Sequence, residues 1–147
     1  METLPFEIAE TAHALRKAFD RRAAGLGVTR AQWQVLFRLS RHPGLRQIEL
    51  ADMLDIEPIT LSRIVDRLEE AGLVERLADP ADRRAWRLHV TTVAEPLVAK
   101  LRALADDMTS EAFAGVDVQD IEIARQVLGR VRENASRATV MNRASNE

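Results

Sequence analysis

The pattern of apolar and polar positions along the chain predicts a series of amphipathic helices interrupted by one alternating segment. The stretch from Pro58 to Gly72 shows the helical pattern most clearly, with a proline at its start and a glycine at its stop. Four of its apolar residues recur at i, i+3, i+4 and i+7 and so form one stripe for a core: Leu61, Ile64, Val65 and Leu68. The opposite face carries hydroxyl and guanidinium groups. Taken alone, such groups are compatible with an ordinary solvent-exposed surface.

The remaining helical segments follow the same logic. A helix is expected over 5–24, a second after Thr29, a short one over 46–54, a long one from Thr91 or Thr92 to about Ala114, and a last one from about Asp117. In the short helix we expect Ile48, Ala51 and Leu54 to face inward. Pro96 is expected to bend the long helix, and the chain from Asn134 onward is expected to be an irregular tail.

The alternating segment predicts a β-hairpin directly after the helix that ends at Gly72. Residues 73–77 and 85–90 alternate between apolar and polar, and Asp79-Pro80-Ala81-Asp82 between them is typical of a turn. The short helix, the turn at 54–57 and the helix that follows match a helix-turn-helix. The predicted fold is therefore mainly α with a small β-hairpin wing, an α+β arrangement.

Composition narrows the class of protein. At 147 residues, with 46% hydrophobic and 30% charged residues, the chain is expected to form a single domain over 1–147. It has no apolar run of membrane-span length and no signal-peptide pattern, so a cytoplasmic location is expected. The absence of cysteine excludes disulfides, thiolate zinc sites and thiol redox sensing. A net charge of −2 argues against a nonspecific nucleic-acid coat but allows a local basic face.

The sequence does not predict an enzyme, and it predicts no metal and no cofactor. An enzyme would have to use His13, His42 or His89 as a base, and no two of these have metal-ligand spacing. No nucleophile elbow, phosphate-binding glycine loop or paired carboxylate motif occurs. A winged helix that docks onto another protein, without specific DNA binding, is the stronger alternative.

Several motifs together resemble the MarR family of winged helix-turn-helix transcriptional regulators, and the run Ala94-Glu95-Pro96-Leu97 is similar to its SlyA branch. The resemblance covers essentially the whole chain. It rests on Gln47-Ile48-Glu49-Leu50-Ala51, the stretch from Thr60 to Glu69, Gly72-Leu73-Val74, and the stretch from Asp82 to Leu88 closed by Val90-Thr91. Three positions depart from the pattern: Asp55 replaces a frequent glycine and tolerates a left-handed conformation, Val90 replaces a leucine, and Trp86 replaces a lysine or other polar residue.

The resemblance implies a homodimer that binds an inverted repeat of double-stranded DNA and regulates transcription as a repressor or an activator. It implies a DNA-binding lobe over about 29–91, and dimerisation helices over about 3–24 and 92–139. Apolar stripes on the flanking helices independently favour a second copy as their partner, with packing back onto the lobe as the alternative. The expected DNA-binding residues are Thr60, Ser62, Arg63, Arg67, Arg83, Arg84 and Arg87.

Each of these residues has a plainer interpretation. Arg63 could pair with Asp66 and Arg67 with Glu70 along the helix, and the basic hairpin tip could simply be solvated. The resemblance implies that Asp82 shapes the wing by pairing with basic side chains. Trp86 fits core or hinge packing better than base stacking.

An effector pocket is expected where the dimer helices meet the lobe. His13, Arg16, Trp33 and Phe37 would supply an anion anchor and an apolar wall for a small aromatic acid. Alternatively, Trp33 and Phe37 are core residues, His13 lies at the dimer interface and Arg16 pairs with Asp20.

Overall fold

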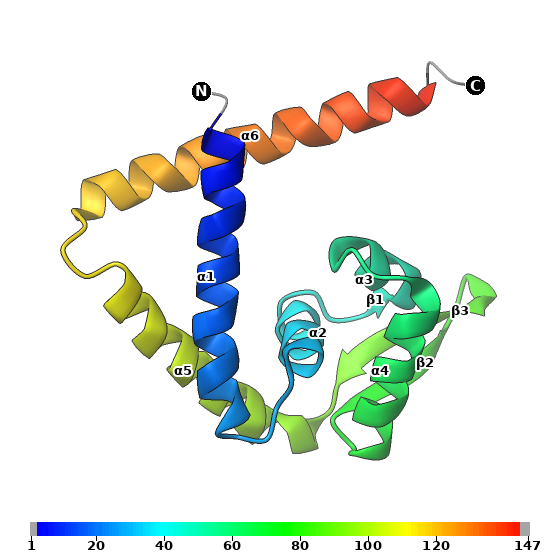
Figure 1. Ribbon diagram of the computed structural model, residues 1–147. Helices are drawn as coiled ribbons and strands as arrows, with labels where there is room; N and C mark the ends of the chain where they lie inside the picture. Colours follow the sequence, from blue (N-terminus) through cyan, green and yellow to red (C-terminus); the bar gives the residue numbers. More distant parts are fainter. Residues whose placement is uncertain (1–2, 145–147) are drawn as a thin grey trace. The chain divides into compact units, whose positions relative to one another are not determined.

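The computed structural model describes residues 3–144, which form six α-helices, one 3-10 turn and a three-stranded antiparallel sheet (Figure 1). Residues up to Ala112 pack as one compact unit, and residues from Phe113 form a second. Within this range no helix is both long and apolar enough to cross a membrane. In chain order the elements are α1 (Leu4–Ala24), α2 (Arg30–Arg41), β1 (Leu45–Arg46), α3 (Gln47–Met53), α4 (Pro58–Glu70), β2 (Val74–Asp79), β3 (Asp82–Val90), η1 (Thr92–Ala94), α5 (Glu95–Ala112) and α6 (Val118–Ala144).

The helix-turn-helix is formed by α3, a tight turn and α4. Asp55 in the turn has φ of 53°, the left-handed conformation that a short polar side chain tolerates. The Ile56 N–H then donates to the Ala51 carbonyl at 3.1 Å, which closes the turn against the end of α3. The apolar stripe of α4 is confirmed, because Leu61, Val65 and Leu68 are fully buried.

One core joins α4 to the rest of the first unit. Helix α2 is started by Thr29, whose hydroxyl accepts from the Gln32 N–H at 3.3 Å while the Gln32 side chain accepts from the Thr29 N–H at 3.1 Å. This capping box sets where α2 begins, and Val35, Leu36 and Leu39 form its buried face. The buried cluster draws on α1 to α5, β2 and β3: Phe19, Ala23, Val28, Val35, Leu36, Leu39, Leu50, Ala51, Leu61, Val65, Leu68, Val74, Leu88, Val98 and Leu101.

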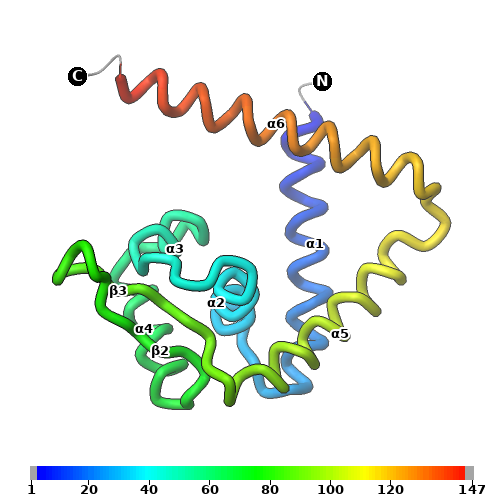
Figure 2. Tube along the Cα trace, turned by 180° about the vertical axis from the view of Figure 1, so that it is seen from behind, coloured from blue at the N-terminus to red at the C-terminus, as the bar shows by residue number. Residues whose placement is uncertain are grey.

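The sheet contains the predicted hairpin and one strand that the sequence did not predict. Its strand order is β1-β3-β2, with Leu45 opposite Leu88 and Val74 opposite Val90. Strand β1 is only two residues long, too short to show an alternating pattern. The β2–β3 hairpin, called the wing here, extends from the sheet beyond α3 and α4 (Figure 2).

Three local predictions were wrong. Ile48 is 67% exposed, because Leu50, Ala51 and Leu54 define the inward face of α3 and Ile48 lies more than 100° around the helix from its centre. Pro96 does not bend a helix interior, since α5 begins only at Glu95 and tolerates a proline in its first turn. Helix α6 continues past Asn134 to Ala144, because the chain after Gly129 contains neither glycine nor proline.

The second unit consists of the turn after Phe113 and helix α6. Gly115 has φ of 80°, which allows the chain to leave α5, and the Asp117 carboxylate accepts from the Gln119 N–H at 2.7 Å at the start of α6. None of the described residues of α6 is buried. Most of its large apolar residues are exposed, among them Val118 by 79% and Ile123 by 58%.

Candidate nucleic-acid interface

Helix α4 presents one polar stripe away from the core. Thr60, Arg63 and Arg67 follow each other at i, i+3 and i+7, so they lie within about 60° of one another on the helix. All three are exposed. The burial of Leu61 and Val65 on the other side fixes this orientation, because rotating the helix would expose them.

The guanidinium groups of Arg63 and Arg67 have no hydrogen-bond or ion-pair partner among residues 3–144. The carboxylate of Asp66, the expected partner of Arg63, is instead 2.7 Å from Arg76 on β2. Glu70 forms no ion pair within the described chain either, so the i, i+3 pair with Arg67 does not form. Both arginines are therefore available to an external anion.

Arg76 is a structural residue that the sequence prediction missed. Its guanidinium contacts Asp66, lies 3.2 Å from the Glu69 carboxylate, and donates to the Gln47 side chain at 3.1 Å and to the Ser62 carbonyl at 3.0 Å. The side chain is only 14% exposed. The sequence did contain a signal for this role. Arg76 lies two residues after Val74 on an alternating strand, so its side chain points to the same, inward face.

These contacts also define the position of Ser62. The Arg76 guanidinium is 3.4 Å from the Ser62 hydroxyl, which is partly buried on the side of α4 that faces the wing. Of the expected contacts on α4, Thr60, Arg63 and Arg67 thus share the outer stripe, whereas Ser62 faces the junction with β2. Arg76 thus joins α4 to the wing through that junction.

The wing is held by a buried carboxylate, Asp79, which the sequence prediction did not single out. One Asp79 oxygen accepts from the Ala81 N–H at 2.9 Å, and the other is 2.9 Å from Arg46 Nε and 3.4 Å from Arg87 Nε. The Ala81 amide, followed by the Arg87 and Arg46 charges, holds the pKa of this carboxyl below its usual value. Asp79 therefore stays ionised and clamps the hairpin turn to β1.

Asp82 and Arg87 differ in role from what the family pattern suggests. The Asp82 carboxylate accepts from the backbone N–H of Arg84 at 2.9 Å, so within the described chain it shapes the tip through the backbone rather than through a basic side chain. Arg87 donates to the Gly44 carbonyl at 3.0 Å in addition to its pair with Asp79. Arg87 is thus a brace between β3 and the start of β1.

Arg83 and Arg84 complete the exposed basic surface. Both are exposed at the wing tip, and neither guanidinium has an ion-pair partner within residues 3–144. The surface formed by α4 and the wing therefore presents four arginines without an ion-pair partner in residues 3–144, Arg63 and Arg67 on the outer stripe of α4 and Arg83 and Arg84 on the wing. Guanidinium forks match phosphate oxygens and the acceptor edge of guanine.

The four expected effector residues have different surroundings in the described part of the chain. Trp33 donates its indole N–H to Asp20 at 2.9 Å and packs edge-on against Phe19, with ring centroids 4.8 Å apart. Asp20 also accepts from Arg30 Nε at 2.8 Å, and this bond is the main cause of the lowered pKa of Asp20. Arg16 lies close enough to act on Asp20 only as a charge. His13 is exposed on α1, well along the helix from this cluster.

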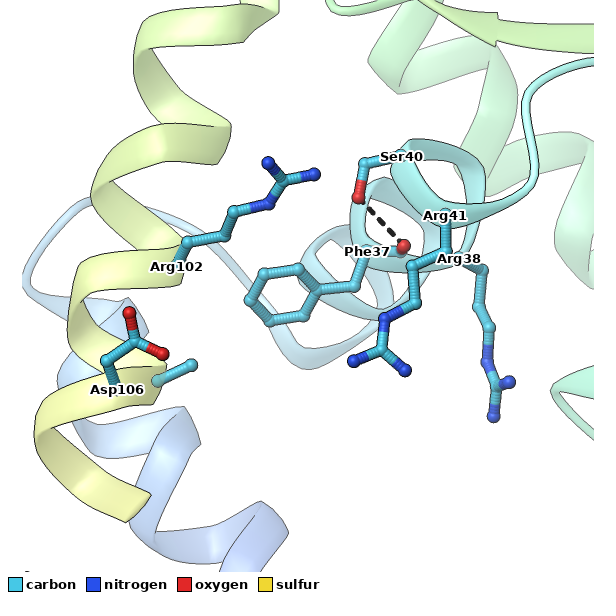
Figure 3. A pocket seen from close by; sticks show the side chains of 7 residues that line it. Phe37, Arg38, Ser40, Arg41, Arg102 and Asp106 are labelled. Carbon is cyan, nitrogen blue, oxygen red and sulfur yellow. Dashed lines mark hydrogen bonds between the residues drawn. The ribbon is translucent and has the colours of Figure 1, made fainter. Parts of the chain in front are cut away.

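A cavity of about 520 Å³ lies instead between α2 and α5 (Figure 3). Phe37 lines it, and three arginines, Arg38, Arg41 and Arg102, lie around it. Arg102 extends from α5 toward Phe37 and Ser40, and the Ser40 hydroxyl donates to the Phe37 carbonyl at 2.9 Å (Figure 3). Of the four predicted residues, only Phe37 reaches this cavity.

Comparisons with known proteins agree with this architecture. Residues 28–86 match the model of the MarR family. The solved transcriptional regulator PA3341 is 38% identical over 90% of this chain and 97% of its own, with a TM-score of 0.82. A crystal structure of MarR is 29% identical over 91% of each chain, with a TM-score of 0.79.

A MarR transcriptional regulator from Methanosarcina mazei Go1 shares the fold, with 24% identity over 93% of this chain and 99% of its own and a TM-score of 0.82. The match to PA3341 spans nearly all of both chains. Its sequence identity of 38% indicates more than a shared fold. Together with the family match, it shows that this chain belongs to the MarR family of winged-helix transcriptional regulators.

Proposed function

We propose that the protein is a sequence-specific DNA-binding regulator that acts as a homodimer on an inverted repeat. The observation that carries the proposal is the set of four unpaired arginines, Arg63 and Arg67 on α4 and Arg83 and Arg84 on the wing. A helix with exposed guanidiniums suits a major groove, and a basic hairpin tip suits the neighbouring backbone or minor groove. The chain as a whole has a net charge of −2, so this surface is a local feature rather than a general excess of charge.

The apolar residues left exposed on the flanking helices support the homodimer. Phe6 on α1 is 74% exposed, and on α6 Ile123, Val127 and Val131 recur at i, i+4 and i+8 and are 58%, 48% and 45% exposed. A repeated apolar stripe of this kind is costly to leave in water. A second copy would cover the same stripe in both partners and would supply the second recognition helix that an inverted repeat requires.

Control by a small anionic aromatic compound belongs to the same proposal. The cavity between α2 and α5 offers the ring of Phe37 and the guanidiniums of Arg38, Arg41 and Arg102, against one carboxylate, Asp106. Such a lining suits an aromatic carboxylate better than a cation. A ligand there would contact both α2, which belongs to the lobe, and α5, which leads toward the second unit.

The experiment that tests the proposal is selection of duplexes from a random-sequence library by the full-length protein. An inverted repeat with half-sites about one helical turn apart is the expected product. The Arg83→Ala/Arg84→Ala double variant should lose most affinity for the selected duplex, whereas Arg21→Ala, which removes an exposed arginine of α1, should not. Recovery of no common sequence would contradict the proposal.

The same variants test the alternative function, a winged helix that docks onto a protein. A docking module has no need of unpaired arginines at the wing tip. If the wild-type protein binds selected and random duplexes equally, and the wing double variant behaves like the wild type, the docking function replaces the proposed one.

A further inference from the structure

Trp86 is a large aromatic residue that lies on β3 and is 47% exposed. It lies one residue beyond the point where β1 ends, since β1 pairs only with Arg87 and Leu88. Its neighbour on β2 is Ala78, whose methyl group covers little of an indole ring. Trp86 shares the strand face of buried Leu88, so its ring faces the helices rather than the opposite side of the wing.

Two hollows meet at this ring. The first, here called the wing hollow, has a volume of about 430 Å³ and is lined by Arg46, Ile48, Pro58, Arg84 and Trp86, with Gln47, Asp82 and Ala85. The second, of about 450 Å³, lies on the α4 side, where Ser62 and Asp66 line it together with Trp86. The wing hollow thus spans from the first residue of the recognition helix to the wing tip.

The wing hollow combines apolar walls with positive charge. Ile48, whose burial was wrongly expected, is 67% exposed and lines it together with Trp86. Its charged lining residues are Arg46, Arg84 and Asp82, so the wing hollow carries a formal charge of +1 in a chain whose net charge is −2. Its occupant should therefore have an apolar face and carry negative charge.

We propose that the wing hollow receives the sugar-phosphate backbone of the bound DNA, with Trp86 and Ile48 packed against deoxyribose. This inference rests on the proposed DNA-binding function. The strand between a major groove read by α4 and a groove touched by the wing tip has to pass between these two elements. Deoxyribose supplies an apolar C–H face and phosphate supplies the charge. The indole N–H only donates hydrogen bonds, which suits phosphate oxygen.

Trp86 would then contribute apolar contact area but would displace no counterions from the DNA phosphates. The arginines around it would displace them. Trp86→Ala is expected to weaken binding to the library-selected duplex by about 5- to 50-fold, from loss of aromatic contact area. It should leave the slope of log affinity against log salt unchanged, whereas Arg84→Ala should reduce that slope by about one. Trp86→Phe, which keeps an aromatic ring, should retain most of the affinity.

Fluorescence tests the position of the ring directly. The chain has two tryptophans, so Trp33→Phe leaves Trp86 as the only one. Its emission should change on addition of the selected duplex, and the duplex should shield it from acrylamide. The converse variant, Trp86→Phe, reports Trp33, whose emission should change much less. Val93→Ala, which truncates another exposed apolar residue, 71% exposed on η1, is the matched control for affinity.

The outcomes separate this inference from the function on which it rests. If the wild-type protein binds its selected duplex but Trp86→Ala binds equally well, or if Trp86 stays open to acrylamide in the complex, the inference is overturned and the DNA-binding function stands. A Trp86 emission that changes with protein concentration alone would place a second copy in the wing hollow and would also overturn it. If no duplex is selected at all, the proposed function itself fails. Unchanged circular dichroism and thermal midpoint of Trp86→Ala are required for the affinity comparison.

Discussion

At the scale of single residues, the basic side chains of the lobe divide into two kinds. Arg46, Arg76 and Arg87 are bound to carboxylates or carbonyls and hold the wing and α4 in place. Arg63 and Arg84 have no such partner within residues 3–144. Position in the sequence does not reveal this division, because Arg84 and Arg87 are three residues apart on the same strand and differ completely in their surroundings.

Arg63 and Arg84 should contact different parts of the DNA. Arg63→Ala is expected to cost about 1–3 kcal/mol and to relax the preference for particular bases, because the proposed function places α4 against base edges. Arg84→Ala should weaken binding more evenly, as loss of a backbone contact does. Titration of both variants against single-base variants of the selected duplex measures this. A uniform loss for Arg63→Ala would make Arg63 a phosphate contact instead.

Asp79 predicts a pH-dependent stability of the wing. Its pKa is lower in the folded protein than its usual value, so the stabilisation is present at neutral pH and is lost as pH falls through the lowered pKa. Asp79→Asn should therefore lower the thermal midpoint at pH 7, and the gap from the wild type should shrink below about pH 4, where the wild-type carboxyl also protonates. Asp82→Asn is the control, because Asp82 is exposed at the tip. A gap independent of pH would contradict the role given to the Asp79 charge.

At the scale of elements, the sequence predicted helices with a strong apolar period and missed contacts between distant segments. The stripe of α4 and the stop at Gly72 are local features, and both were predicted correctly. The contacts of Arg76 with Gln47 and of Asp79 with Arg46 join residues 29 and 33 positions apart, counted for the second pair from the residue numbers. No local pattern encodes such pairs, and Ile48 was misplaced because a seven-residue helix defines its inward face only once it is packed.

In the candidate site, too, local features could be predicted and contacts between distant segments could not. The outer stripe of α4 and the basic wing tip could be predicted from spacing, whereas the role of Arg87 as a brace could not. Two of the expected effector residues, His13 and Arg16, lie on α1, whereas the cavity opens between α2 and α5 and is lined by Phe37 and Arg102. Trp33, the most conspicuous candidate, donates a hydrogen bond to Asp20 and packs against Phe19.

The cavity between α2 and α5 gives a prediction at this scale. Millimolar salicylate at fixed ionic strength should weaken binding of the selected duplex by roughly 5- to 150-fold, the usual range for a coupling between two sites. Arg102→Ala should abolish this response while leaving duplex affinity without salicylate unchanged, because Arg102 does not belong to the DNA-binding surface. Arg130→Ala, on α6, is the matched control. An identical response of Arg102→Ala and wild type would show that salicylate does not act through this cavity.

At the scale of the whole molecule, the exposed face of α6 predicts an assembly of two chains. Ile123→Glu with Val127→Glu places two charges on this face without touching the core, since neither residue is buried within the chain. Sedimentation should show a dimer for the wild type and its loss, as monomer or as unfolded aggregate, for the double variant. Gln119→Glu with Gln126→Glu adds the same charge at polar positions of α6 and should remain dimeric. A double glutamate variant that dimerises like the wild type would contradict the proposed interface.

Loss of the dimer should also reduce specific binding far more than nonspecific binding. Two recognition helices that act on one duplex combine their specific contacts, whereas one lobe retains only half of them. The prediction links the exposed face of α6 to the arginines of α4.

The most direct test of the central claim compares the affinity of the full-length protein for its selected inverted repeat with that for a scrambled duplex of equal length and composition. Both are titrated at the same near-physiological salt concentration, because phosphate contacts alone change strongly with salt. The inverted repeat should bind at least about a thousandfold more tightly, as specific complexes typically do. Equal affinity for the two duplexes would contradict it.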